Sequence, residues 1–207
     1  MPQAYPLMLD VTSRLVVIIG GGAVAVRKVK GLLEASATRV RVVSPTFHAE
    51  MPADVERITA TYQPSQLDGA QLVFAATDSP AVNEQVVADA RQRGVLVSRA
   101  DDGDAGDFVT PARFQEGEVI VTVTAGSPAL AVVIRDELAQ RIDRRHLQMA
   151  HAMRELRPGI VGSGLAPERR AAVFRDLASD EAMNALDANK VEGLRGWIRQ
   201  RYPELKL

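Results

Sequence analysis

Residues 16–33 have the sequence VVIIGGGAVAVRKVKGLL, in which four β-branched residues precede three glycines and a run with helical spacing. The glycines contain the spacing Gly20-x-Gly22-x-x-Ala25, which is typical of a strand-to-helix turn that binds the diphosphate of a dinucleotide. Gly20 permits a sharp turn, and Gly22 has no Cβ to obstruct a diphosphate. Ala25 is small enough for the helix to pack closely against the strand. The stretch therefore predicts a dinucleotide site.

The start of this helix supplies the groups that would hold the diphosphate. The first helical amides belong to Ala23 and Val24, and amides at a helix N-terminus point toward a bound anion. A tight bend with no ligand satisfies the same spacing. The glycine turn by itself therefore leaves the structural alternative open.

Apolar runs that alternate with helical patterns extend over the first half of the chain. A helix follows the glycines, and a second is predicted at 81–93, where Pro80 suits the first turn. Nearly continuous apolar strands separated by helices are typical of a parallel sheet covered on both faces. The fold class predicted is therefore α/β with a Rossmann-type parallel sheet. The runs expected to form its strands are Leu15–Ile19, Val40–Val43, Gln71–Ala75 and Val95–Ser98.

The second half has a different pattern. Strand-like runs at 108–113 and 118–124, separated by a turn at 115–117, predict a β-hairpin. Ser127 and Pro128 suit the start of a long helix that continues to about residue 157. Its apolar stripe consists of Leu130, Val133, Ile134 and Leu138.

The chain then ends in helical segments. A Gly- and Pro-rich break at 157–168 precedes short helices at about 167–178 and 180–201. We expect a nucleotide-binding domain at 1–107, a hairpin and long helix at 108–157, and a small helical domain at 158–207.

The composition excludes several classes of function. The formal net charge of −1 argues against nucleic-acid or membrane-surface partners, and the absence of cysteine excludes disulfides and thiolate chemistry. The chain begins without the basic and apolar segments of a signal peptide, and no apolar run reaches the roughly 20 residues of a membrane span. We therefore expect a cytoplasmic protein. His48, His146 and His151 lack the spacing of metal ligands, so no metal site is predicted.

The end of the second strand bears on the choice of cofactor. Many dinucleotide sites have an acidic residue there that binds the ribose hydroxyls. This chain has VVSPTFH, so Ser44, Pro45 and Thr46 are the candidate cofactor-binding residues at that strand. Arg41 leaves NADP open as an alternative, and we favour NAD.

Three segments together resemble the precorrin-2 dehydrogenases, the dehydrogenase/ferrochelatase modules of siroheme synthesis. They are VVIIGGGAVAVRKV with its following VVSP, LVFAATDSPAVN, and DFVTPARFQEGEVIVTVTAGSPALAVVIRDEL. The resemblance covers about residues 6–145. It implies a homodimer that oxidises precorrin-2 to sirohydrochlorin with NAD, and it makes the hairpin and long helix at 108–157 the dimerisation region. Some members of this family also insert Fe²⁺, so the resemblance leaves chelation open.

The resemblance also implies site residues. The segment SRADDGDAGDF is similar to the family stretch that carries an essential acid, which selects Asp101 as the catalytic residue. Ser98 and Gly103 depart from the family's Asn and Pro, and the neighbouring Asp102 is an alternative. A hydrated acidic loop without a catalytic role is a third interpretation.

Further cofactor-binding positions follow the third strand. They are Ala76, Thr77, Asp78 and Asn83, with helix capping as an equal interpretation of Asp78. Candidate substrate-binding residues, for a substrate rich in carboxylates, are Arg99, Arg113, Ser127 and Arg135. A cluster of Arg141, Arg144 and Arg145 is expected to complement the C-terminal dipole of the long helix, with contact to substrate or to a partner subunit as the alternative. The alternative function is a dinucleotide-sensing regulatory module that performs no chemistry.

Overall fold

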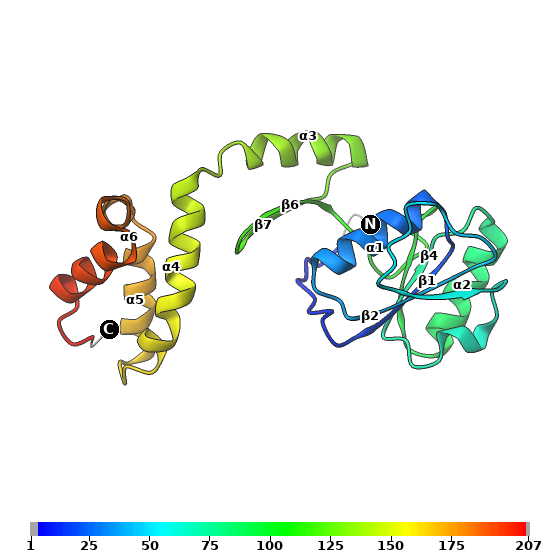
Figure 1. Cartoon of the computed structure of the whole chain (residues 1–207), viewed down its shortest axis with the longest axis horizontal. Helices are drawn as coiled ribbons and strands as arrows, with labels where there is room; N and C mark the ends of the chain where they lie inside the picture. The colour runs from blue at the N-terminus through cyan, green and yellow to red at the C-terminus, as the bar shows by residue number, and fades with distance from the viewer. Residues whose placement is uncertain (1–3, 206–207) are drawn as a thin grey trace. The chain divides into compact units, whose positions relative to one another are not determined.

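The structure is a computed structural model that describes residues 4–205. The chain divides into two compact units, Met1–Thr110 and Pro111–Leu207. The three-part division at residues 107 and 157 stays a prediction. In chain order the first unit contains β1 (Leu15–Ile19), α1 (Ala23–Glu34), β2 (Arg39–Ser44), β3 (Glu56–Thr59), the 3₁₀-helix η1 (Pro64–Leu67), β4 (Leu72–Ala75), α2 (Pro80–Gln92) and β5 (Leu96–Arg99) (Figure 1). The second contains β6 (Ala112–Glu116), β7 (Val119–Val123), α3 (Pro128–Ala139), α4 (Arg144–Val161), α5 (Pro167–Leu177) and α6 (Asp180–Arg201).

The first unit is a five-stranded parallel sheet. The strand order is β3-β2-β1-β4-β5, so that β1 is central, with Ile19 opposite Val43 on one side and Ala75 on the other. All strands point the same way, and their carboxyl ends therefore meet at one edge. The predicted Rossmann-type sheet is confirmed.

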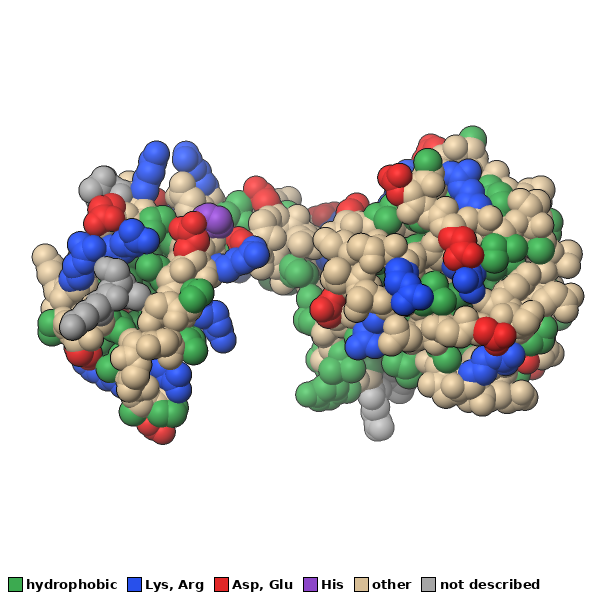
Figure 2. All heavy atoms as spheres, turned by 60° about the horizontal axis from the view of Figure 1, so that its bottom comes forward, with side chains coloured by type: hydrophobic (Ala, Val, Ile, Leu, Met, Phe, Trp, Pro, Cys, Tyr) green, Lys and Arg blue, Asp and Glu red, His purple; other side chains and the backbone are tan. Residues whose placement is uncertain are grey.

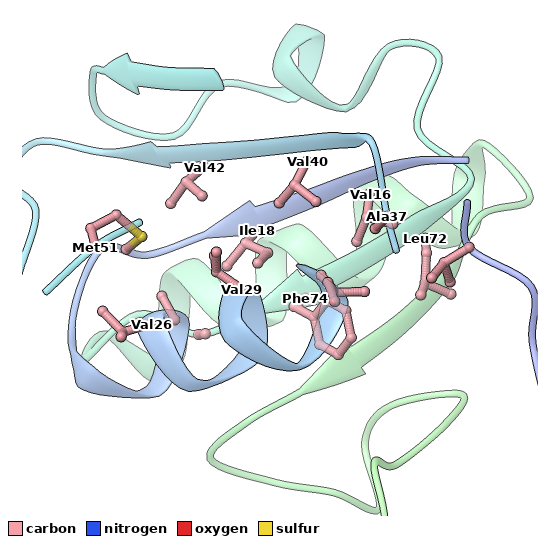
Figure 3. Close-up of a cluster of buried hydrophobic side chains, with 14 residues drawn as sticks. Val16, Ile18, Val26, Val29, Ala37, Val40, Val42, Met51, Leu72 and Phe74 are labelled. Carbon is pink, nitrogen blue, oxygen red and sulfur yellow. The ribbon is translucent and has the colours of Figure 1, made fainter. Parts of the chain in front are cut away.

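Both faces of this sheet are buried, which explains the continuous apolar runs. Val16 and Ile18 of β1 pack on α1, in the cluster drawn in Figure 3. The alternate residues Val17 and Ile19 pack in the opposite cluster, which contains Val86 of α2. Because successive side chains of a strand point to opposite faces, each run needs an apolar residue at every position.

One strand was not predicted from the sequence. β3 is an edge strand with the sequence ERIT, and most of its side chains are exposed. An edge strand with solvent on one side has no continuous apolar run. The search for such runs, by which the other strands were predicted, therefore does not identify β3.

The predicted hairpin exists, but its limits were wrong. The first strand is Ala112–Glu116, and the two-residue turn lies at Gly117 and Glu118, with Gly117 at φ 55°. The residue predicted to begin the strand, Phe108, instead packs edge-on against Phe74, with ring centroids 5.3 Å apart. Burial of Phe108 in the first unit thus outweighs its strand propensity.

The predicted single long helix is two helices. α3 ends at Ala139 and α4 begins at Arg144, because the Asp143 carboxylate accepts hydrogen bonds from the amides of Arg145 and His146 and starts a new helix. Arg144 and Arg145 therefore lie at a helix N-terminus, and the predicted complement to a C-terminal dipole is wrong for both. Arg145 instead pairs with Asp143.

The C-terminal helices follow the prediction more closely. α4 continues through Pro158 to Val161, so the break begins later than expected. α5 and α6 match the two predicted short helices. They pack with α4 around a buried core that includes Leu156, Leu177 and Ile198.

The apolar stripe of α3 is on the surface of the chain. Leu130 is 50% exposed and Val133 53%, and Leu138 is also exposed, whereas the small residue Ala131 is buried. The helix turns its small residue toward its own unit and leaves its large apolar residues uncovered.

Charges on the first unit are mixed. On the face drawn at the right of Figure 2, basic and acidic side chains lie side by side. This face therefore carries no continuous basic surface of the kind that binds polyanions. Within residues 4–205, no helix combines the length and apolar character that crossing a membrane requires.

Candidate functional site

The first glycine of the turn is required by its backbone. Gly20 has φ 122°, and a Cβ placed on it would lie 2.2 Å from the carbonyl oxygen of Ala76. Its amide donates to the carbonyl oxygen of Val43. The end of β1 thus lies tightly between the ends of β2 and β4, where no side chain fits.

The second glycine is required by packing, which the predicted spacing did not include. A Cβ on Gly21 would lie 2.1 Å from the carbonyl oxygen of Thr46 and 2.7 Å from the Ser44 hydroxyl. The amide of His48 donates to the Gly21 carbonyl oxygen at 2.8 Å. Gly21 therefore lets the loop after β2 close onto the turn, and the run of three glycines is the sequence feature that points to it.

The third glycine faces open space. No heavy atom lies within 4 Å of a Cβ built on Gly22, which is exposed and has an extended backbone. Gly22 is the N-cap of α1, no side chain caps the helix, and its first turn has no acidic residue. The amides of Ala23 and Val24 are thus offered at the positive end of the helix dipole. This cradle fits a dinucleotide diphosphate.

A cavity of about 640 Å³ opens in front of the cradle. Its walls are the segments that follow the carboxyl ends of β1, β2, β3 and β4. All of the predicted cofactor-binding residues line it except Asn83: Gly20, Gly22, Ala23, Val24, Ser44, Pro45, Thr46, Ala76, Thr77 and Asp78. Their contact with a cofactor stays a prediction. Lining residues that the sequence did not suggest are Gly21, Phe47, His48, Ala60, Thr61, Tyr62, Ser79 and Val82, among others.

Asn83 lies behind the cavity wall and is fully buried. Its Oδ1 accepts hydrogen bonds from the amide (3.0 Å) and the hydroxyl (2.7 Å) of Thr77, and its Nδ2 donates to the Thr77 carbonyl oxygen. Nδ2 also donates to Oδ1 of Asp101 at 2.8 Å. One buried amide thus joins the cavity wall to the predicted catalytic carboxylate. Helix α2 is capped by Ser79, so Asp78 is left to the cavity.

Asp101 is held by three donors. Besides Asn83, Arg99 donates from Nε to Oδ1 and from Nη2 to Oδ2, both at 3.0 Å. The hydrogen bonds from Arg99, and then that from Asn83, hold the pKa of Asp101 below its ordinary value, although partial burial acts in the opposite direction. The carboxylate is therefore ionised at neutral pH.

The rest of the acidic loop is folded back on the sheet. Asp102 accepts hydrogen bonds from the amides of Asp104 and Ala105 and closes a local turn. Asp107 accepts from the amide of Val97 and pairs with Arg91 at 2.9 Å. The loop is therefore ordered by its own hydrogen bonds and ion pairs, and whether it has a catalytic role stays a prediction. Asp101 differs from Asp102 because it is hydrogen-bonded to Asn83, which is in turn hydrogen-bonded to Thr77 in the cavity wall.

The predicted substrate-binding residues lie in different surroundings. Arg99 is engaged by Asp101 and by the carbonyl oxygen of Pro80. Ser127 caps α3 through the amide of Leu130. Arg135 donates to the carbonyl oxygen of Arg113, which brings β6 and α3 together in the second unit, and it pairs with Asp136. Substrate contact by these residues stays a prediction.

The histidines are dispersed. His48 lines the cavity, His146 is paired with Asp143 at the start of α4, and His151 lies 3.6 Å from both Glu118 and Glu155. Arg41, which left NADP open, is paired with Glu56 at 2.9 Å and also donates to the carbonyl oxygen of Gln66.

Comparisons with known proteins agree with this geometry. The chain is 35% identical over 155 residues to a siroheme synthase of Chromobacterium violaceum, covering 72% of this chain and 33% of that protein. It is 36% identical over 154 residues to a siroheme synthase of Nitrosomonas eutropha, covering 70% and 32%. The chain therefore spans about a third of the length of these curated relatives.

A solved structure has the same fold. It is described as "SirC, precorrin-2 dehydrogenase", and it matches with a TM-score of 0.75 and 24% identity, over 95% of this chain and all of that one. Residues 7–112 match the family model described as "Putative NAD(P)-binding". This range contains the glycine turn, the cavity and Asp101. The chain belongs to this NAD(P)-binding family.

Proposed function

We propose that the chain is an NAD⁺-dependent dehydrogenase that oxidises precorrin-2 to sirohydrochlorin. The observation that carries the proposal is the hydrogen-bonded connection from Thr77, at the wall of the dinucleotide cavity, through Asn83 to Asp101. It brings an ionised carboxylate to the carboxyl edge of the sheet, where ligands of open α/β sheets bind. The names of the similar siroheme synthases and of the solved dehydrogenase support this substrate.

The cofactor proposed is NAD⁺. The diphosphate would be held by the amides of Ala23 and Val24 in front of Gly22, and the adenosine ribose would lie near Ser44 and Thr46. Arg41 is engaged by Glu56 and is absent from the cavity lining, so it is not placed to bind a 2′-phosphate. Bound there, NAD⁺ would accept the hydride that leaves the substrate.

The surroundings of Asp101 favour an electrostatic role. Loss of a hydride leaves positive charge on the reduced ring system, and a fixed carboxylate stabilises that charge without having to reorganise. Three donors already bind the Asp101 oxygens and keep its pKa low, which makes it a weak proton acceptor. In this proposal Asp101 stabilises the positive charge that develops on the substrate, and water accepts the proton that the substrate loses.

The substrate is rich in carboxylates, and the proposal retains Arg113 and Arg135 as its cationic contacts. Arg113 lies on β6 and Arg135 on α3, and the Arg135 side chain donates a hydrogen bond to the backbone carbonyl oxygen of Arg113. Arg99 and Arg135 each already pair with a carboxylate, Asp101 and Asp136, so in this proposal the substrate shares each guanidinium with that partner.

We further propose that the chain forms a homodimer through the exposed apolar residues of α3 and the hairpin. Leu130, Val132 and Val133 of α3 and Ile120 of β7 are all at least 40% exposed. Among the described residues, β6 and β7 pair only with each other, so each has an open edge. A two-stranded sheet of this kind gains stability from a partner.

The double substitution Leu130→Glu with Val133→Glu is expected to convert the dimer to a monomer, because two carboxylates would be buried in the apolar interface. Light scattering after size exclusion measures the mass. The matched control is Val161→Glu, which places the same charge on an exposed valine of α4 and should leave the dimer intact. A dimer that persists in the double variant would place the interface elsewhere.

The function itself is tested with purified protein, precorrin-2 and NAD⁺ under anaerobic conditions. We expect sirohydrochlorin and NADH to appear in equal amounts, with no reaction when NAD⁺ is omitted. Fe²⁺ is then added as a second substrate to test chelation. Protein that binds NAD⁺ but neither binds nor oxidises precorrin-2 would favour the sensing module instead.

A further inference from the structure

The strand order divides the cavity into two halves. The open cradle that fits the diphosphate is at the N-terminus of α1, next to the central strand β1. In sheets of this order the adenosine follows the strands on the β2 side, and the nicotinamide lies on the β4 side. The segments after β2 and β3 therefore form the adenosine half of the cavity.

Two aromatic residues appear in the described cavity lining, Phe47 and Tyr62. Phe47 packs on the core beneath α1, and the guanidinium of Arg57 lies over its ring, 5.9 Å from the centroid. Tyr62 follows β3 and is only partly buried. It packs on the opposite core together with Val82 of α2, which also lines the cavity.

The orientation of the Tyr62 side chain is fixed by a hydrogen bond at its hydroxyl end. Its hydroxyl donates to Oδ2 of Asp89 at 2.8 Å, and Asp89 is a buried carboxylate of α2 that takes no part in the proposed chemistry. Gln85 donates to the other oxygen at 3.0 Å, so both oxygens of Asp89 are paired. Burial, and then the hydrogen bond to Asp89, raise the pKa of Tyr62, which keeps the hydroxyl a donor at neutral pH.

We propose that the ring of Tyr62 is the surface on which the adenine base of the dinucleotide lies, and that Asp89 is the positioning residue that holds this ring. An aromatic wall suits any base, because each base has a flat π-face. A ring anchored at its far end loses little side-chain freedom when the base binds. The inference rests on dinucleotide binding alone and does not depend on the proposed oxidation.

The test uses titration calorimetry on the full chain with NAD⁺, ADP and nicotinamide mononucleotide. In Tyr62→Leu we expect the affinities for NAD⁺ and ADP to fall together by about tenfold, because the stacking surface is lost. The affinity for nicotinamide mononucleotide should not change. Tyr62→Phe separates the ring from its anchor: it keeps the stacking surface but loses the hydrogen bond to Asp89, so its affinities for NAD⁺ and ADP should fall only by about threefold, as in Asp89→Ala.

The role of Asp89 is tested by the same three ligands. Asp89→Asn retains an acceptor for the Tyr62 hydroxyl and is expected to bind ADP normally. Asp89→Ala removes the anchor and should weaken ADP and NAD⁺ binding by about threefold, on the order of 0.7 kcal/mol. If Asp89 contributed only to stability, the folded fraction of Asp89→Ala would bind ADP and nicotinamide mononucleotide with wild-type affinity. A loss of ADP affinity with no loss for nicotinamide mononucleotide therefore indicates the positioning role.

A measurement on the wild-type protein covers the case in which Tyr62→Leu does not fold. Tyr62 is one of three tyrosines, and the other two, Tyr5 and Tyr202, lie outside the cavity and serve as references. ADP should shift the ring resonances of Tyr62, and inorganic pyrophosphate should not.

Three results would overturn the inference: unchanged ADP affinity in folded Tyr62→Leu, a loss confined to nicotinamide mononucleotide, or no shift of Tyr62 when ADP binds. A wild-type chain that binds neither NAD⁺ nor ADP would overturn dinucleotide binding at this cavity altogether. Failure of the Tyr62 inference can therefore be distinguished from failure of the whole site.

Discussion

Replacing Gly22 with valine is expected to raise the dissociation constant for NAD⁺ by at least about a hundredfold, or about 2.8 kcal/mol. The added methyl groups would occupy the open space in front of the α1 amides, where the diphosphate must approach. The fold should persist, since Gly22 has φ −81° and no neighbour within 4 Å of a new Cβ. Valine is a poorer N-cap than glycine, so about 1 kcal/mol of stability is lost. Calorimetry gives the affinity, and urea unfolding gives the stability.

The matched control is Gly31→Ala in the same helix. A Cβ at Gly31 also meets nothing within 4 Å, but Gly31 lies two turns from the cradle. This variant should bind NAD⁺ normally and unfold at slightly higher urea, because alanine favours a helix by up to about 1 kcal/mol over glycine. Normal NAD⁺ binding by Gly22→Val would mean that the glycine turn is only structural.

Asp101→Asn is expected to reduce kcat for precorrin-2 by at least about a hundredfold, the usual effect of removing one electrostatic stabiliser. Asparagine keeps the size of the side chain and one acceptor for Arg99 or Asn83, so the loop should stay in place. The dissociation constant for NAD⁺ should change by less than about threefold, because Asp101 is not part of the cavity lining. Steady-state kinetics and calorimetry separate the two effects.

Asp102→Asn is the control for this variant. Its carboxylate accepts hydrogen bonds only from nearby amides in the contacts described, and it has no link to Asn83. Turnover close to that of the wild type is expected. A large loss in Asp102→Asn with full turnover in Asp101→Asn would transfer the role to the neighbouring residue.

The lowered pKa of Asp101 predicts that this residue contributes no pH dependence to the activity near neutrality. A carboxyl with a lowered pKa in the folded protein contributes stability that is present above its unfolded pKa and is lost as the pH falls through the folded value. The charge on Asp101 should therefore persist below pH about 4, the ordinary value for aspartate. No acidic limb from this residue is expected in a pH–rate profile near neutrality.

The strands that could be predicted are those with both faces covered. β1 and β4 need an apolar residue at every position, and the sequence shows this directly. β3 could not be found in this way, because its edge position leaves ERIT mostly exposed. The stripe on α3 illustrates a different limit. An apolar face looks the same in sequence whether it packs inside one chain or against a second one.

The site shows the same division. The glycine spacing and the helix start are local patterns, and they led to Gly22 directly. Asp101 was selected within the aspartate-rich loop by the resemblance to the precorrin-2 dehydrogenases. The link from Thr77 through Asn83 to Asp101, and the Tyr62–Asp89 pair, join segments far apart in sequence. Hydrogen bonds between such segments depend on how strands and helices pack. Spacing along a chain carries local geometry only, so these contacts emerge once the sheet has formed.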